Sequence, residues 1–118
     1  MKPRMILCLL LGVVGCGSAQ VPAERMAASE ASIRAADEVG AKNVPTAALH
    51  LQFAKEQVEQ AKQLIASNDN ERARWVLLRA EADAELALVL AREQTMRDSA
   101  QKALQQVQEV RQNGKVPE

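Results

Sequence analysis

The chain has 118 residues, and its 15 basic and 15 acidic side chains give a formal net charge of zero. The composition favours helices, with 21 alanines and 11 glutamines against five glycines, four prolines and no tyrosine. Balanced charge and one Phe and one Trp argue against a nucleic-acid binder, which would show a basic patch and stacking side chains. One His and two Cys leave little material for a metal site or a nucleophile–base pair. We therefore predict a single all-α domain, since domains run roughly 100–150 residues, with no enzymatic activity, metal, cofactor or small-molecule substrate.

The first fifteen residues have the pattern of an export signal. Lys2 and Arg4 provide a positively charged start, and an apolar run follows over residues 5–14. An apolar run of about 7–15 residues is typical of a secretory signal peptide, whereas a membrane span needs roughly 18–20 apolar residues. We predict that residues 1–15 are removed, which leaves 13 basic and 15 acidic residues.

Residues 13–16, Val-Val-Gly-Cys, resemble the lipobox of bacterial lipoproteins. In lipoproteins a small residue precedes a cysteine that is lipidated on sulfur and acylated on its new amino terminus. The resemblance implies that Cys16 joins the chain to membrane lipid and that residues 16–21 form a lipidated tether. Gly17 replaces the aspartate that signals inner-membrane retention in Gram-negative lipoproteins, which implies an outer-membrane protein of the bacterial envelope facing the periplasm. An ordinary signal cut at Gly-Cys-Gly, a small-x-small site, is the alternative.

Three helical segments are expected over residues 22–113. The first covers residues 22–39, because Pro22 suits a first helical turn and Gly40 suits the left-handed position after the last turn. The second covers residues 45–67. Asn68 and Glu71 have capping-box spacing, so we expect Asn68 to cap a third helix. No Pro or Gly interrupts that helix before Asn113.

The second and third helices each carry an apolar stripe at 4-3-4-3-4 spacing. The stripes consist of Ala47, Leu51, Ala54, Val58, Ala61 and Ile65, and of Ala73, Leu77, Ala80, Ala84, Ala87 and Ala91. Two such stripes joined by a short turn predict an antiparallel hairpin, in which alanine lets the helix backbones approach closely. The shorter first helix packs against this hairpin.

The third helix also has apolar residues on its opposite side. In its first half these are Trp75, Ala82, Leu86 and Val89. We expect this part to receive the first helix through Met26, Ile33 and Ala36. We also expect Trp75 and Phe53 to fill the ends of the hairpin, where alanine alone would leave voids.

The third helix is longer than its neighbours. At 1.5 Å per residue it spans about 65 Å and the second helix about 35 Å, so about 30 Å should overhang the bundle. The overhang carries a heptad-spaced seam of Met96, Ala100, Ala103, Val107 and Val110. The i,i+4 pairs Glu93–Arg97 and Asp98–Lys102 flank it. Either this is a solvated single helix, or the seam binds a second copy or another envelope protein.

The remaining polar candidates fit structural roles. His50 has no metal-ligating neighbour one helical turn away, so we expect a surface or helix-start histidine. Glu81, Asp83 and Glu85 alternate around the helix and cannot converge as an acid–base pair. Asp83 should instead pair with Arg79 at i,i+4. The sequence contains no phosphate loop, GxSxG, HExxH or CxxC motif.

Residues 44–103 resemble the alanine-rich lipoprotein domain called Domain of Unknown Function 4398. The resemblance rests on the lipobox, a proline that opens the second helix, the Leu/Ala series, the Asn/Asp turn and the alanines at helical spacing after it. Relatives are bacterial envelope lipoproteins, some fused to or encoded beside peptidoglycan-binding OmpA-like domains. The resemblance implies an envelope protein and carries over no catalytic residues.

We therefore expect a non-catalytic envelope lipoprotein that acts as a structural or adaptor module through its helix surfaces. One alternative is a tetratricopeptide-like scaffold that grips a peptide, although only one helix pair is found. A second is an alanine-zipper brace between outer membrane and peptidoglycan, which would self-associate. An enzyme or ligand-binding module is disfavoured, because pockets of ~300–1,000 Å³ need larger walls than alanine supplies.

Overall fold

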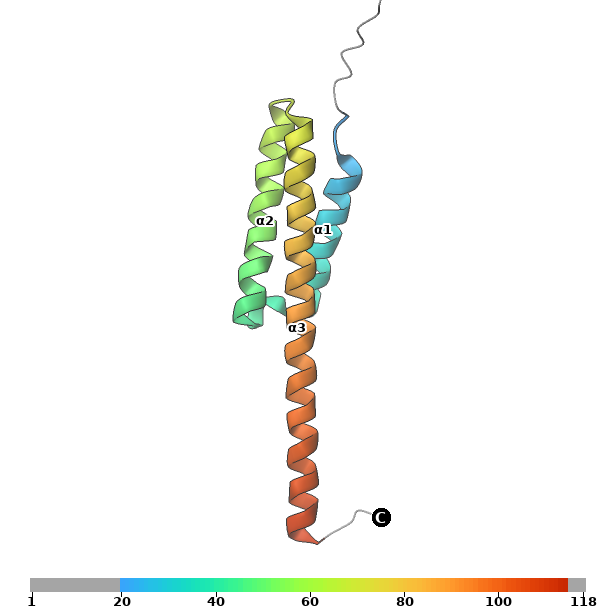
Figure 1. Ribbon diagram of the computed structural model, residues 1–118, viewed down its shortest axis with the longest axis vertical. Coiled ribbons are helices and arrows are strands. Elements are labelled where there is room, and N and C mark those ends of the chain that lie inside the picture. Colours follow the sequence, from blue (N-terminus) through green and yellow to red (C-terminus); the bar gives the residue numbers. More distant parts are fainter. Residues whose placement is uncertain (1–19, 115–118) are drawn as a thin grey trace, which may run out of the picture.

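The computed structural model describes residues 20–114, and every regular element in this range is helical (Figure 1). In chain order these are α1 (Ala23–Glu38), a short 3-10 helix η1 (Ala41–Asn43), α2 (Pro45–Ala66) and α3 (Asn70–Asn113). The all-α prediction is confirmed, and the observed helix bounds lie within one or two residues of those expected. The proposed signal over residues 1–15 and the proposed lipid-bearing Cys16 lie outside the described residues.

The helices form a small bundle in which α3 contacts both of the others (Figure 1). Ala36, near the end of α1, belongs to the same buried cluster as Ala87 and Ala91 of α3, whereas Met26, near the start of α1, packs on a cluster at the start of α3. Thus α1 and α3 run in the same direction, and α2 runs opposite to both. The predicted antiparallel hairpin is formed by α2 and α3.

Two left-handed residues shape the connections. Gly40 has φ +81° after α1, as its position in the sequence predicts. Between α2 and α3 the left-handed residue is Asn68, with φ +60°, so the prediction that Asn68 caps α3 is wrong. Asp69 is the cap instead, and its side chain accepts a hydrogen bond from the Arg72 backbone N–H at 3.3 Å. Asparagine tolerates this conformation better than most residues, and aspartate is a strong N-cap.

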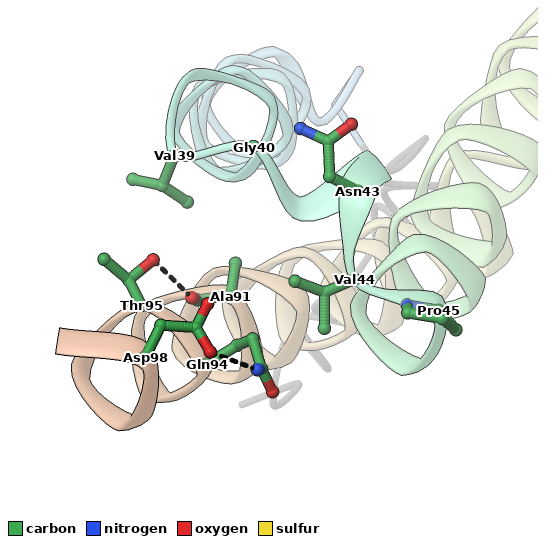
Figure 2. A pocket seen from close by; sticks show the side chains of 9 residues that line it. All are labelled: Val39, Gly40, Asn43, Val44, Pro45, Ala91, Gln94, Thr95 and Asp98. Atoms are coloured by element: carbon green, nitrogen blue, oxygen red, sulfur yellow. Dashed lines mark hydrogen bonds between the residues drawn. The ribbon is translucent and has the colours of Figure 1, made fainter. Parts of the chain in front are cut away.

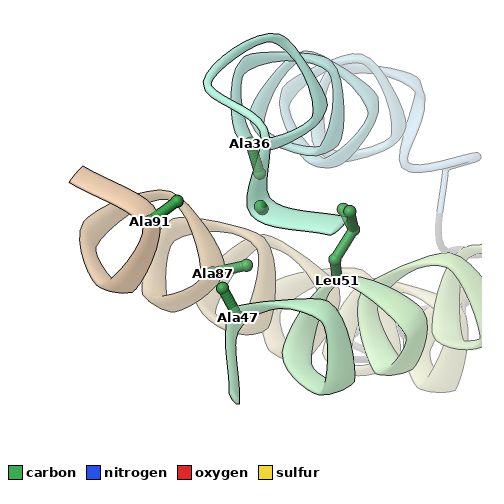
Figure 3. Packing of buried hydrophobic residues seen from close by; sticks show 6 residues of the cluster. Ala36, Ala47, Leu51, Ala87 and Ala91 are labelled. Carbon is green, nitrogen blue, oxygen red and sulfur yellow. The ribbon is translucent and has the colours of Figure 1, made fainter. Parts of the chain in front are cut away.

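The core is built mainly from alanine (Figure 3). All of the α3 stripe, and all of the α2 stripe except the half-buried Ile65, is buried, which confirms both predicted stripes. Figure 3 shows Ala36 of α1 meeting Ala47 and Leu51 of α2 beside Ala87 and Ala91 of α3. Small side chains allow helix backbones to pack closely, so modest apolar groups can fill the interior. Leu77 is the largest fully buried side chain.

A buried hydroxyl fastens α1 to α3. Ser29 is completely buried, and its Oγ lies 2.8 Å from the Arg25 carbonyl oxygen and 2.9 Å from the Leu77 carbonyl oxygen. The hydroxyl has one proton, so it donates to one of these carbonyls at a time. The second contact joins residues 48 positions apart in the chain and fixes the axial position of α1 on α3.

Ion pairs on the surface connect α1 with α2. Lys55 Nζ lies 2.8 Å from Asp37 Oδ2, and Lys62 Nζ lies 3.9 Å from Glu30 Oε1. Lys62 also donates a hydrogen bond to Glu59, and this bond raises the pKa of its ammonium group. Because these side chains are largely solvated, the pairs add little to the stability of the bundle.

The end of α3 leaves the bundle as expected. Its buried positions stop at Ala91, and residues 92–113 are all exposed. These 22 residues extend about 33 Å at 1.5 Å per residue. Figure 1 shows this segment projecting alone below α1 and α2. The predicted overhang is therefore confirmed. It ends at Gly114, which adopts φ +59°.

Candidate interaction surface on α3

The side of α3 that faces away from the bundle carries uncovered apolar side chains. Ala82 and Leu86 are exposed, while Ala84 between them is completely buried, as expected for residues about 200° apart around a helix. Val89 is 58% exposed on the same side. The bundle therefore covers only one side of α3.

The expected docking of α1 on this side is wrong. Met26, Ile33 and Ala36 do face α3, as predicted. They pack instead around the buried stripe, in clusters that include Leu77, Ala80 and Ala87. Both α1 and α2 pack on the side of α3 that carries the buried stripe, so one broad face of α3 contacts both helices.

The two aromatic side chains do not fill the hairpin ends. Trp75 is 55% exposed and Phe53 is 40% exposed. The Arg74 guanidinium lies 4.8 Å from the Trp75 ring centroid, and Phe53 makes an edge contact with the His50 ring at 6.2 Å. Alanine, valine and leucine side chains occupy the buried positions of both clusters, and neither ring is among them.

The exposed apolar positions on the body of α3 continue onto the overhang, with the charged Glu93 between Val89 and Met96. All five residues of the predicted seam are exposed, with Met96 at 66%. We call the combined surface the outer stripe; its members are Trp75, Ala82, Leu86, Val89, Met96, Ala100, Ala103, Val107 and Val110. From residue 82 to residue 110 the positions alternate by four and three, and Glu93 is the one charged residue at these positions.

The polar flanks of the overhang differ in part from expectation. Arg97 donates to Glu93 at 2.6 Å, which confirms the first predicted i,i+4 pair. Asp98 does not pair with Lys102 but accepts a hydrogen bond from Gln94 at 2.9 Å. The side chain of Asp98 is short, and the side-chain amide of Gln94, one helical turn earlier, lies within hydrogen-bonding distance of it.

A depression of about 460 Å³ lies where the overhang leaves the bundle (Figure 2). It is lined by Val39, Gly40, Asn43, Val44, Pro45, Ala91, Gln94, Thr95 and Asp98. Figure 2 shows its two internal hydrogen bonds, from Thr95 Oγ1 to the Ala91 carbonyl oxygen at 3.1 Å and from Gln94 to Asp98. Asp98 is the single charged residue in this lining.

A polar cluster ties α2 to α3. Asp83 accepts a 2.7 Å hydrogen bond from Gln57 Nε2 through Oδ2, and its Oδ1 lies 2.9 Å from His50 Nδ1. The expected Arg79–Asp83 pair is therefore wrong, and His50 is half-buried rather than a free surface residue. Glu81 accepts instead from Arg25 of α1 at 3.2 Å. The carboxylates of Asp83 and Glu81 thus contact different helices, α2 and α1, and do not converge, as predicted.

Replacing Asp83 with alanine should lower the free energy of unfolding by about 1–2 kcal/mol, because two interhelical partners lose their acceptor at a half-buried site. Chemical denaturation followed by circular dichroism measures this difference. Asp98→Ala is the matched control, since the hydrogen bond of Asp98 lies within its own helix at an exposed position and its loss should cost about 0.5 kcal/mol or less. Equal losses in the two variants would show that the cluster does not stabilise the bundle.

Two further observations concern the described part of the chain. Among residues 20–114, no three His, Cys, Asp or Glu side chains come together in a way that could hold a metal ion. None of the helices in the same range has both the length and the hydropathy to cross a membrane.

The geometry defines a small helical-hairpin domain, packed on alanine, whose last helix extends beyond the bundle. The family model described as a domain of unknown function (DUF4398) matches residues 24–107, so the chain belongs to this family. The match covers α1 and most of the overhang, and is therefore wider than the resemblance noted over residues 44–103. No curated protein and no solved structure matches the sequence.

Proposed function

We propose that this protein is a lipid-anchored, non-catalytic adaptor of the bacterial cell envelope that binds a partner chain through the outer stripe of α3. The observation that carries the proposal is the overhang, where 22 consecutive helical residues are all exposed yet keep an apolar seam. Exposed apolar side chains gathered in one line, rather than scattered singly, are typical of an interaction site.

The construction of α3 supports this role. Most helices in proteins are stabilised mainly by packing, and nucleating a free helix is unfavourable; here the bundle holds the first half of α3 and so removes the cost of nucleating the second half. The overhang is thus presented as a preformed rod. A preformed helix loses less conformational entropy on binding than a segment that must fold at the same time.

The resemblance of residues 13–16 to a lipobox supports the lipid anchor in this proposal. Acylation at Cys16 would anchor the chain just before the tether that leads into α1. The protein would then act from the membrane surface, with α3 as its binding element.

Met96→Asp and Val107→Asp test the adaptor role. Each places a charge in the seam, so each should abolish crosslinking to an envelope protein that the native chain captures in cells. Both positions are exposed and outside the bundle, so the helical content and the denaturation midpoint should stay unchanged.

Leu49→Asp is the matched control for these variants, because Leu49 is 50% exposed on α2, away from the outer stripe. It should leave the crosslinked product intact. Unchanged capture by Met96→Asp and by Val107→Asp would rule out the overhang as the binding site.

A further inference from the structure

We propose that the outer stripe pairs with the outer stripe of a second copy of this chain, with the two α3 helices antiparallel. The inference deepens the proposed function, on which it rests for the binding surface, by naming the partner. It uses the whole of α3 rather than the overhang alone.

The length of the stripe is the first argument. The overhang by itself holds about two heptads, fewer than the three or four that define a coiled coil. With Ala82, Leu86 and Val89 uncovered on the body, the 4-3 alternation extends from residue 82 to residue 110, which is four heptads. Such a pattern is that of a coiled-coil seam.

The surface area that a dimer would bury is the second argument for using the whole outer stripe. A strip about 10 Å wide along the 36 residues from Trp75 to Val110 is about 54 Å long and would bury about 1,100 Å² over the two partners. Stable interfaces begin near 1,000 Å². The 15 residues from Met96 to Val110 alone would bury about 450 Å² and would fall short. A stable complex therefore requires the body as well as the overhang.

The two halves of α3 have equal lengths. Residues 70–91 form the body and residues 92–113 the overhang, so each half has 22 residues. In an antiparallel pair with its twofold axis near Ala91, the overhang of each copy lies along the body of the other. Both uncovered halves of the outer stripe are then covered at once.

Charge selects this orientation over a parallel one. A parallel, in-register pair would set Glu93 against Glu93 at the centre of the seam and Arg92 beside Arg97 at its edge, and both contacts are repulsive. In the antiparallel register centred at Ala91, Glu93 faces Val89 of the second copy and lies next to Arg92 of that copy. The same register sets Ala82 opposite Ala100 and Trp75 opposite Val107.

Disulfide crosslinking in the full-length protein tests the arrangement. Cells producing one copy with Ala82→Cys and another with Ala100→Cys should yield a crosslinked dimer on mild oxidation. Either variant alone should show no more dimer than the native chain, whose Cys8 and Cys16 define the background. Dimer from Ala82→Cys alone would indicate parallel pairing and overturn the proposal, as would the absence of dimer in the mixed cells.

Val89→Asp gives an independent measurement. Val89 lies on the body, so the substitution should weaken self-association, measured by sedimentation of the full chain in detergent, by about tenfold or more while leaving the bundle folded. Leu49→Asp should leave self-association unchanged, and equal sedimentation of Val89→Asp and the native chain would contradict the proposal. If no dimer forms but Met96→Asp still loses an envelope protein, self-pairing fails and the adaptor role stands.

Discussion

Replacing Cys16 with serine should remove the acyl mass from the protein and deplete it from the outer-membrane fraction. The lipidation expected here modifies a thiol, and serine has none. Each buried acyl CH₂ contributes about 0.8 kcal/mol to membrane binding; one chain gives only reversible attachment, whereas two or more hold a protein stably. Because no other anchor is proposed, the loss should be nearly complete. Intact mass spectrometry and membrane fractionation measure it.

Cys8→Ser is the matched control for this experiment. Cys8 lies in the segment proposed to be removed, so the mature protein should have the same mass and location as the native one. A native chain that carries an unmodified Cys16 and stays in the soluble fraction would refute the anchor. The interaction proposed for α3 would remain, now for a free helical adaptor.

Replacing Leu77 with alanine should lower the free energy of unfolding by about 2–5 kcal/mol, the usual range for a buried leucine. Leu77 is completely buried in a cluster with Val58 and Ala61 of α2, and Met26 and Ile33 of α1 pack against the same cluster. Its buried neighbours are alanine and valine side chains held by the helix backbones, so the site should relax only partly into the space left behind. Since single domains have about 5–15 kcal/mol of total stability, this loss is a large share. Urea denaturation followed by circular dichroism measures it.

The control for this substitution is Leu49→Ala. Leu49 is half-exposed on α2 and lies in neither buried cluster, so the same change should cost about 0.5 kcal/mol or less. Similar losses in the two variants would mean that the cluster around Leu77 does not hold the three helices together.

The sequence predicts the helices and the hairpin well because both depend on local periodicity. An apolar residue every third or fourth position must lie on one side of a helix, so the stripe from Ala73 to Ala91 identifies the buried face without further information. Gly40 marked the end of the first helix for a similar reason, since a left-handed residue is needed there.

The sequence predicts the placement of side chains between helices poorly. Trp75 is apolar and was expected inside, yet it is exposed; Asp83 was expected to pair within its own helix, yet it contacts His50 and Gln57 of α2. The spacing of residues along a helix gives their angle around it, but it does not show which angles the neighbouring helices cover.

For this protein, the sequence alone determined the three helices, the alanine-packed hairpin and the overhang, because helix periodicity, turn residues and the unequal lengths of the segments act locally. Only the tertiary structure decided that α1 shares the buried side of α3 with α2, because that depends on contacts between residues far apart in the chain, such as Ser29 with Leu77. That choice leaves the other side of α3 uncovered from Trp75 to Val110, so two apolar segments lie in one line on either side of Glu93.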